Sequence, residues 1–409
     1  MNTSNKLKIF NDPIYGFITI PNPLIFDLIA HPYFQRLRRI SQMGLSYLVY
    51  PGAHHTRFHH ALGCLHLMQK AVRILRFKEV SISIEEENAL YIAILLHDIG
   101  HGPFSHAMEH SIVHDIDHES ISLRFMEQLN NEFDGQLSLA ITIFKGLYPR
   151  RFFGQLISSQ LDMDRSDYLK RDSFYTGVSE GNINSERLIS MMNVVDDQLV
   201  IEKKGTFSIE KFLTARRLMY WQVYLHKTSL VAEQMIINVL KRAKDLVQQS
   251  VELNASPSFE FFLKETINAS NFDSNVLNQF SKLDDYDIIA ALKSWQNHPD
   301  AVLSALSVRL LERKLFKIKF YKKGQISQEL KKMKVQWQQR TNCSNDDISY
   351  YIFSGTIKNT GYKPHKDGIS ILHKDGSVSD VIDVPDNLNF KGLSKTVKRH
   401  YICFPKELL

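Results

Sequence analysis

Four residues in the first half of the sequence carry side chains that can bind a divalent metal ion. His97 and Asp98 are adjacent at the end of an apolar stretch, while His60 precedes them and Asp164 follows. Imidazole nitrogens and carboxylate oxygens together suit a borderline ion and leave positions open for water and phosphate. Each residue alone would be an ordinary helix cap or hydrogen-bonded core group. As a set, the four predict an open, catalytic metal site.

The turn that follows Asp98 is rich in histidine. The segment His101-Gly102-Pro103-Phe104-Ser105-His106 adds two imidazoles beside a buried helix, which predicts a role beyond packing. Glycine and proline here end the preceding helix, because proline cannot continue its hydrogen-bond ladder. The polar motif therefore lies at a helix end.

A row of side chains at helical spacing can position a substrate next to the metal. Asp164, Tyr168 and Asp172 stand at i, i+4 and i+8, so one helix face presents a ligand, a ring and a carboxylate in line. A sugar fits along such a face. The alternative for Tyr168 is an ordinary half-buried aromatic residue.

A second row consists of Arg216, Tyr220 and Tyr224, again at i, i+4 and i+8, and Lys227 follows it. Cations and phenols on one stripe suit the oxygens of a polyphosphate. The alternative for Arg216 is a surface salt bridge.

Helices must position these residues. Apolar residues recur at helical intervals over residues 85–96 and 212–246, and this pattern dominates the first 310 residues. After residue 315 the pattern alternates, and strands are predicted at residues 315–320, 349–353 and 368–372. We predict a mainly α fold with two parts, a helical core over residues 1–315 and a small α+β extension over residues 316–409.

Composition limits the class of protein. With 409 residues and 44% hydrophobic content, the chain can bury a large core. The longest apolar run, residues 89–96, is far shorter than the roughly 20 residues that cross a bilayer. The N-terminus has no secretory pattern, and the three cysteines are scattered singly, so we expect a cytoplasmic protein with reduced thiols.

Positive charge is concentrated near the C-terminus. The net charge is +6, and residues 301–409 hold 20 Lys and Arg against 10 Asp and Glu. Such a bias can serve polyphosphate ligands or nucleic acid, or it can be a solvated surface or a subunit contact.

An ordered set of motifs resembles the HD-domain superfamily and, within it, the SAM-and-HD-domain deoxynucleoside triphosphate (dNTP) triphosphohydrolases. No separate SAM domain is visible in the sequence. A bare His-Asp pair is weak evidence, whereas an ordered series of motifs is specific. The series comprises Asn11-Asp12-Pro13-Ile14-Tyr15-Gly16, Phe34-Gln35-Arg36-Leu37-Arg38, Pro51-Gly52-Ala53, Arg57-Phe58-His59-His60, residues 97–106, Asp164-Arg165-Ser166-Asp167-Tyr168 and Tyr224-Leu225-His226-Lys227.

The resemblance implies a metal-dependent hydrolase with an HD helical core. Its metal ligands would be His60, His97, Asp98 and Asp164, and the ion could be manganese, iron, nickel, zinc or magnesium. Water would attack the α-phosphorus, so that the products are a deoxynucleoside and inorganic tripolyphosphate.

The resemblance also implies catalytic roles for four further residues. His106 matches a histidine that protonates the leaving 5′ oxygen, and Glu109 matches an acidic partner that orients it, although the family more often has aspartate there. His118 matches a histidine that contacts phosphate, and His101 matches another of the same turn.

Substrate contacts follow from the same resemblance. Tyr168 would lie against the deoxyribose where a 2′-hydroxyl would clash, and Asp172 and Gln42 would hold the 3′-hydroxyl. Arg57 would grip phosphate. Arg216, Tyr220 and Tyr224 match family positions that hold Arg, His and Tyr, so Tyr220 is a departure from the family pattern.

Related enzymes form oligomers around nucleotide-filled interfaces, so the resemblance implies a homotetramer with an activator nucleotide. The N-terminal segment offers Lys8, Asn11, Gln35 and Arg38 for that nucleotide. Ala30 stands where guanine-activated relatives carry aspartate. A methyl group accepts no hydrogen bond, so we expect no selective activation by GTP.

Two alternatives stay open. The same metal set would serve an HD phosphohydrolase acting on a nucleoside monophosphate, an alarmone or a cyclic dinucleotide. A protein of another class could use the basic C-terminal part to bind nucleic acid, with salt-sensitive affinity for single strands.

Overall fold

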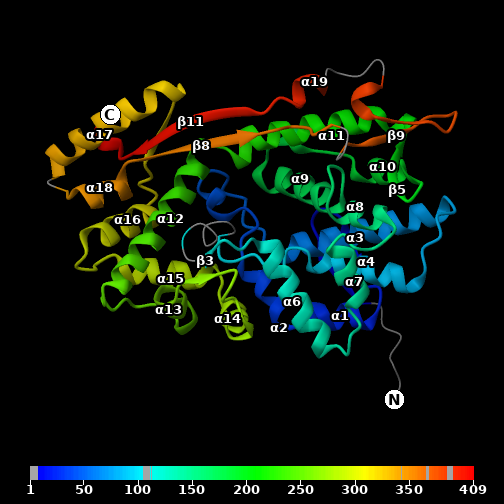
Figure 1. The fold of residues 1–409 in the computed structure, drawn as a ribbon, viewed down its shortest axis with the longest axis horizontal. Coiled ribbons are helices and arrows are strands. Elements are labelled where there is room, and N and C mark those ends of the chain that lie inside the picture. The colour runs from blue at the N-terminus through cyan, green and yellow to red at the C-terminus, as the bar shows by residue number, and fades with distance from the viewer. Residues whose placement is uncertain (1–7, 105–110, 112, 342, 365–367, 385–389) are drawn as a thin grey trace.

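The computed structural model of the chain describes residues 8–104, 111, 113–341, 343–364, 368–384 and 390–409. This described part is mainly helical, with small sheets at its edges, which confirms the predicted fold class (Figure 1). The helices of the first half are α1 (Pro23–Ala30), α2 (Pro32–Gln35), α3 (Arg57–Phe77), α4 (Ile84–Leu96), α6 (His118–Glu132), α7 (Ser138–Phe144), α8 (Arg151–Ile157), α9 (Met163–Thr176) and α10 (Ser185–Ser190).

The second half continues with α11 (Thr206–Met219), α12 (Lys227–Gln248), α13 (Pro257–Lys264), α14 (Ser274–Phe280), α15 (Asp285–Trp295), α16 (Ala301–Leu311), α17 (Ile326–Thr341), α18 (Asn345–Tyr351) and α19 (Phe390–Leu393). A π-helical turn, Tyr220–Tyr224, separates α11 from α12. In the described part no helix is both long enough and apolar enough to span a bilayer.

Helix α4 lies at the centre of the core. All its side chains from Ala89 to Leu96 are buried, as expected for a helix that is apolar on every side. Its start is fixed by a capping box, in which the Ser83 hydroxyl accepts from the Glu86 amide at 3.1 Å and the Glu86 carboxylate accepts from the Ser83 amide at 2.7 Å. Helix α3 packs against both α4 and α9, so the helices that carry the predicted metal ligands are neighbours.

The strands of the described part form four small sheets. Their bounds are β1 (Ile9–Asp12), β2 (Gly16–Thr19), β3 (Val113–His114), β4 (Met192–Val195), β5 (Gln198–Glu202), β6 (Ile267–Asn268), β7 (Lys317–Tyr321), β8 (Phe353–Asn359), β9 (Ser370–Leu372), β10 (Val378–Asp380) and β11 (Val397–Phe404). The first two strands make an antiparallel hairpin, and β3 pairs with β6 in parallel.

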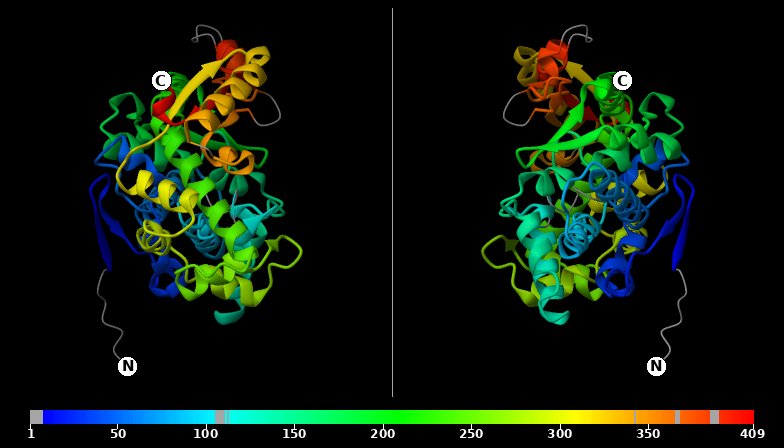
Figure 2. Two further views of the ribbon diagram at one scale, coloured as in Figure 1. Left: turned by 90° about the vertical axis from the view of Figure 1, so that its left-hand side faces the viewer. Right: turned by 90° about the vertical axis from the view of Figure 1, so that its right-hand side faces the viewer.

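The two larger sheets tie the C-terminal extension to the helical core. One has the order β7-β11-β8 and is antiparallel, with Ile402 of β11 opposite both Lys319 of β7 and Ser354 of β8. The other has the order β10-β9-β5-β4, in which β9 pairs in parallel with β5 of the core. Both views in Figure 2 place the yellow-to-red extension against one side of the helical body. The division at residue 315 remains a prediction.

One prediction of local structure is wrong. Residues 349–353 were expected to form a strand, but Ser344 caps α18 by accepting from the Asp347 amide, and the strand β8 begins only at Phe353. A local polar cap here outweighs the hydrophobic period. The helical interval predicted over residues 212–246 is confirmed, with a π-helical turn between α11 and α12 and His226 as the cap of α12.

A buried arginine fixes the turn after α4. Arg36 is fully buried and donates to the carbonyl oxygens of Ile99 (2.7 Å), His101 (3.1 Å) and Leu283 (3.2 Å). Its guanidinium also lies over the rings of Phe125 and Phe280. One side chain therefore joins the histidine-rich turn to the segment before α15.

A buried carboxylate holds the same turn from its other end. Asp285 accepts from the amides of Phe104 (2.7 Å) and Ser41 (2.8 Å). Burial raises the pKa of Asp285 to about 6, although these hydrogen bonds favour its charged form. Residues 99–104 are thus held from both ends.

We predict that Arg36→Leu lowers the free energy of unfolding by about 3 kcal/mol or more, because three buried carbonyl groups lose a charged donor. The measurement is urea unfolding followed by circular dichroism. Arg73→Leu, on an exposed position of α3, is the matched control and should change stability by less than about 0.5 kcal/mol. Equal effects of the two substitutions would contradict the role given to Arg36.

Candidate active site

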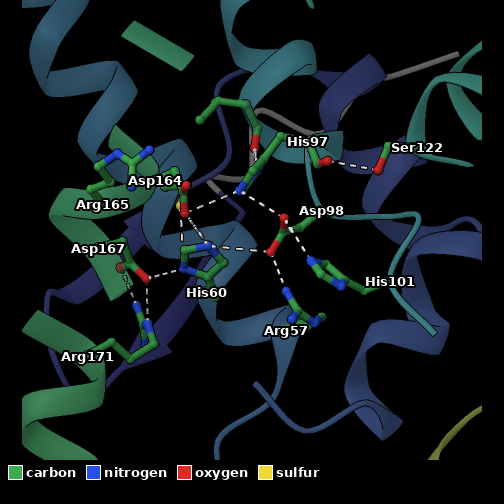
Figure 3. A network of polar contacts seen from close by, with 12 residues as sticks. Arg57, His60, His97, Asp98, His101, Ser122, Asp164, Arg165, Asp167 and Arg171 are labelled. Carbon is green, nitrogen blue, oxygen red and sulfur yellow. Dashed lines mark hydrogen bonds and ion pairs between the residues drawn. The ribbon is translucent and has the colours of Figure 1, made fainter. Parts of the chain in front are cut away.

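Three helices bring together the four predicted metal ligands. His60 comes from α3, His97 and Asp98 follow α4, and Asp164 begins α9 (Figure 3). The Asp164 carboxylate lies 3.1 Å from His60 Nε2 and 3.6 Å from His97 Nε2. The Asp98 carboxylate lies 3.8 Å from His60 Nε2 and 3.5 Å from His97 Nε2. The two imidazole nitrogens therefore lie between the Asp98 and Asp164 carboxylates. Ligand atoms of His60, Cys64, His97 and Asp164 all lie within 4.8 Å of one another, and those of Asp98, His101 and His118 form a neighbouring group of the same kind.

The opposite ring nitrogens set the tautomers of both histidines. His97 Nδ1 lies 2.7 Å from the carbonyl oxygen of Ile94, which can only accept, so the proton sits on Nδ1. His60 Nδ1 lies 2.7 Å from the carboxylate of Asp167, which fixes its proton in the same way. In the neutral rings both Nε2 lone pairs then point toward the carboxylates.

This arrangement fits a metal cation. Lone pairs of nitrogen and carboxylate oxygen repel one another unless a positive charge lies between them, and His97 Nε2 is a buried atom with no hydrogen-bond partner among the described residues. Burial disfavours the charged form of His60, but Cys64, Asp164 and Asp167 outweigh it and hold the pKa of His60 well above its ordinary value. The cluster attracts positive charge and could hold a divalent ion.

The buried sulfur of Cys64 lies one helical turn from His60. Its Sγ is 3.6 Å from both ring nitrogens of His60, so it lies against the ring. Burial raises the pKa of the Cys64 thiol strongly. Its sulfur still lies close enough to the ligand atoms of His60, His97 and Asp164 to join them around a metal ion, which would lower that pKa.

Asp98 also contacts an arginine and a histidine on its other side. Arg57 donates to one carboxylate oxygen, and His101 Nε2 lies 3.4 Å from the other. Burial alone would raise the pKa of Asp98, but His97, His101 and Arg57 hold it well below its ordinary value. The rings of His101 and His118 stack with their centroids 3.9 Å apart, so these two predicted catalytic residues stand together beside Asp98.

A cavity of about 470 Å³ opens from this cluster. Of the predicted substrate residues, Gln42, Arg57, Tyr168, Asp172, Tyr220 and Tyr224 line it. Its wall also includes Met43, Gly44, Leu45, Ser46, Phe104, Arg165, Ser229, Glu233 and Ile236. Polar side chains therefore line the cavity both beside the predicted metal ligands and along the face of α9.

The face of α9 has the predicted geometry. Asp164, Tyr168 and Asp172 all line the cavity in the order that helical spacing requires. The Tyr168 hydroxyl and Gln42 Oε1 are both buried, and neither has a hydrogen-bond partner among the described residues. Both atoms can bond to a ligand that enters the cavity.

Asp172 is held from two sides. His55 Nε2 lies 2.7 Å from one of its oxygens, and the Tyr224 hydroxyl donates to the other at 2.7 Å. The His55 side chain is completely buried and its ring stacks on Tyr175. The carboxylate therefore keeps one orientation, with lone pairs left for a further donor.

The second predicted row lies along α11 and the π-helical turn that follows it. The Arg216 guanidinium lies 5.9 Å from the Tyr220 ring centroid, and the Tyr220 and Tyr224 rings lie 5.2 Å apart, so the three side chains are neighbours in order. In the turn the Leu225 amide donates to the Tyr220 carbonyl oxygen at 2.8 Å, an i to i+5 bond. Both tyrosines line the cavity, whereas Arg216 lines a neighbouring one. Their role toward a polyphosphate remains a prediction.

The four residues predicted for an activator nucleotide lie near the N-terminal hairpin. Gln35 accepts from Arg38 Nε at 2.9 Å, and the Arg38 guanidinium lies over the Phe58 ring. The Lys8 ammonium lies over the Phe26 ring, and Asn11 pairs with Phe17 in the hairpin. None of the four lines the catalytic cavity as far as the described residues define it. Their role remains a prediction.

His106 and Glu109, predicted as a catalytic pair, lie outside the described residues. The roles predicted for the other site residues are likewise untested by geometry alone. What the structure adds is their arrangement around one cluster and one cavity.

Sequence reasoning missed several residues that organise the site. Asp167, Arg171, His55 and Asp12 were quoted at most as parts of motifs, yet each holds a functional side chain in place. The signal that could have found Asp167 and Arg171 is their spacing, because Asp and Arg at i and i+4 of one helix can form an ion pair.

Comparisons with known proteins agree with this geometry. A family model described as the HD domain matches residues 57–171, which include all four predicted ligands, and a model described as an HD associated region matches residues 183–256. A phosphohydrolase structure from Bacteroides thetaiotaomicron is 51% identical, covers 98% of this chain and all of its own, and superposes with a TM-score of 0.93.

Two curated proteins extend the comparison. The uncharacterized protein YwfO of Bacillus subtilis is 35% identical over 76% of this chain and 71% of its own length. A deoxynucleoside triphosphate triphosphohydrolase SAMHD1 homolog of Dictyostelium discoideum is 30% identical over 62% of this chain, and this match spans about half (52%) of that protein.

We predict that Asp98→Asn lowers metal affinity by more than about 100-fold and abolishes hydrolysis, because an amide is a poor ligand and removes one negative charge from the cluster. The measurement is metal content by mass spectrometry after dialysis against a limiting ion. Asp115→Asn makes the same change at an exposed position and should keep full occupancy. Normal metal content in Asp98→Asn would overturn the ligand assignment.

Proposed function

The chain belongs to the HD-domain phosphohydrolase family, and from this premise we propose that it is a metal-dependent dNTP triphosphohydrolase. In this proposal it converts a deoxynucleoside triphosphate to a deoxynucleoside and tripolyphosphate by attack of water on the α-phosphorus. The observation that carries the proposal is one continuous cavity that joins the metal cluster to the Tyr168 ring and to the Asp172 carboxylate. A phosphatase without a sugar to recognise does not require the last two residues.

His60, His97, Asp98 and Asp164 would hold the ion. When bound, a divalent cation supplies Lewis-acid polarisation of a phosphate oxygen and activation of water. The remaining steps belong to the side chains that line the cavity.

The phosphates would lie at the cationic end. Arg57 and Arg165 line the cavity beside Asp98 and Asp164, and their guanidinium groups can donate to non-bridging oxygens. The stacked pair of His101 and His118 stands at the same end and offers further ring nitrogens to phosphate. His106 is proposed to donate a proton to the leaving 5′ oxygen, oriented by Glu109.

The deoxyribose would lie along α9. In this pose the Tyr168 ring contacts the face of the sugar at C2′, while Asp172 and Gln42 bond to the 3′-hydroxyl. The fixed orientation of Asp172 between His55 and Tyr224 supports this pose, because a pre-positioned acceptor loses less entropy on binding. The relative from Dictyostelium discoideum carries the name of this activity, which further supports the choice of substrate.

The proposal includes a homotetramer with an activator nucleotide near Lys8, Asn11, Gln35 and Arg38. The metal identity is left to experiment among manganese, iron, nickel, zinc and magnesium. Because Ala30 supplies no acceptor, GTP is not expected to activate selectively.

We predict that a dNTP incubated with the protein and a divalent ion yields tripolyphosphate and the deoxynucleoside, because the metal cluster and Arg57 would meet at the α-phosphate. Phosphorus NMR identifies the products directly, and Asp98→Asn is the control for contaminating enzymes. Pyrophosphate with a monophosphate, or orthophosphate alone, would show that the reaction class is wrong even if the metal site is right.

We predict that Tyr168→Ala reduces discrimination between dNTP and ribonucleotide substrates by about tenfold or more, since removing the ring opens space beside C2′. The measurement is the ratio of kcat/KM for dATP and ATP. Tyr168→Phe keeps the ring and should keep the ratio, which separates steric exclusion from the hydroxyl. Unchanged discrimination in Tyr168→Ala would remove Tyr168 from the selectivity mechanism.

A further inference from the structure

His55 is a buried histidine that belongs neither to the metal cluster nor to the lining of the catalytic cavity, as far as the described residues define them. It precedes α3 by two residues, and its side chain is completely buried. Its ring stacks on Tyr175 of α9, with the centroids 4.4 Å apart and the planes 13° from parallel. Burying a polar ring is unfavourable unless its nitrogens form hydrogen bonds, so the contacts of His55 indicate what it does.

The His55 side chain forms one hydrogen bond within the described part of the chain. Nε2 lies 2.7 Å from the Asp172 carboxylate, and a carboxylate can only accept, so Nε2 carries the proton. Nδ1 is buried and has no hydrogen-bond partner in the same part of the chain. The polar side of the ring is therefore directed at Asp172 alone.

The His55 backbone holds Gln42, the other residue proposed to contact the 3′-hydroxyl. The His55 carbonyl oxygen accepts from the Gln42 amide at 3.0 Å, and the neighbouring residues Ser41 and Thr56 form an isolated antiparallel bridge. Both Gln42 and Asp172 line the catalytic cavity. One residue thus joins two cavity-lining residues that come from distant parts of the sequence.

The segment that carries His55 is fixed against the end of α9. A Cβ atom at Gly52 would lie 2.6 Å from the Tyr175 carbonyl oxygen, so only glycine allows this close approach. The stacking of His55 on the Tyr175 ring is a second contact between the same two segments. The fold therefore sets the separation of Gln42 and Asp172 across the cavity.

We propose that His55 is a positioning residue for recognition of the 3′-hydroxyl, acting through the Asp172 side chain and the Gln42 backbone. His55 Nε2 and the Tyr224 hydroxyl both donate to Asp172, so its remaining lone pairs require a further donor from the ligand. A hydroxyl at C3′ supplies that donor, and a 3′-deoxy sugar does not. This inference rests on the proposed function, which places the deoxyribose along α9.

The test compares kcat/KM for dATP and for 2′,3′-dideoxyadenosine triphosphate, which differ only in the 3′-hydroxyl. The parent protein should prefer dATP. His55→Gln places an amide nitrogen near the position of Nε2, whereas His55→Asn places it near that of Nδ1. His55→Gln should keep the preference within about threefold, and His55→Asn should lower it about tenfold or more, because Asp172 loses a donor. His54→Asn, at the exposed neighbouring histidine, is the matched control and should keep the preference.

A merely structural role predicts a different result. In that case His55→Asn would lower kcat/KM for both nucleotides by the same factor, which would overturn the proposal. Equal preferences in His55→Gln and His55→Asn would overturn it as well. His55→Phe keeps a ring that can stack on Tyr175 but has no donor, so it should show the loss expected of His55→Asn and replaces that variant if it does not fold.

Binding measurements separate this inference from the proposed function. Absence of dATP cleavage by the parent protein would contradict the proposed function, and the role of His55 is then tested without turnover. Isothermal titration calorimetry compares non-hydrolysable analogues of dATP and of the dideoxy nucleotide, and His55→Asn should remove the parent's preference for the 3′-hydroxyl. A parent protein that binds the two analogues equally would overturn the proposal.

Discussion

His60 can present Nε2 to a metal ion because Asp167 accepts the proton on the opposite nitrogen. Asp167 is completely buried, and Arg171 neutralises it through two parallel hydrogen bonds of 2.9 Å. A third buried charge, Asp12, accepts from the same guanidinium at 2.7 Å. A chain of contacts thus runs from the N-terminal hairpin to the metal cluster, and the rest of the site depends on it, since a buried charge without its partner is strongly unfavourable.

Close packing of two helices makes that chain of contacts possible. A Cβ atom at Gly63 of α3 would lie 1.9 Å from an Asp167 carboxylate oxygen and 2.3 Å from an Arg171 nitrogen, so only glycine leaves room for the ion pair. Gly100 has the same function on the other side, where a Cβ would lie 2.2 Å from the His118 carbonyl oxygen. Hairpin, α3 and α9 must therefore assemble together, which couples formation of the metal cluster to folding of the whole core.

Features that depend on residues close together in the sequence could be predicted. The ligand set, the face of α9 and the helical core follow from residue types and spacing, because one helix repeats every 3.6 residues wherever it lies. The π-helical turn after α11 could not be predicted, because nothing in the hydrophobic pattern marks it. His55 and Asp12 depend on contacts with residues more than 100 positions away, at Asp172 and Arg171. Long-range pairs of this kind leave no periodic signal in a single sequence.

The contribution of the basic C-terminal extension depends on where it contacts the helical core. Much of its positive charge is exposed, as at Lys317, Lys319, Lys358 and Lys398, and exposed charges of this kind are screened by salt. Lys363 is exposed too, but Gln160 holds its backbone against the core, where it lines one cavity together with Arg165 and Arg216. The extension therefore contributes to the junction with the core through residues whose positions are fixed by hydrogen bonds, more than through its net charge.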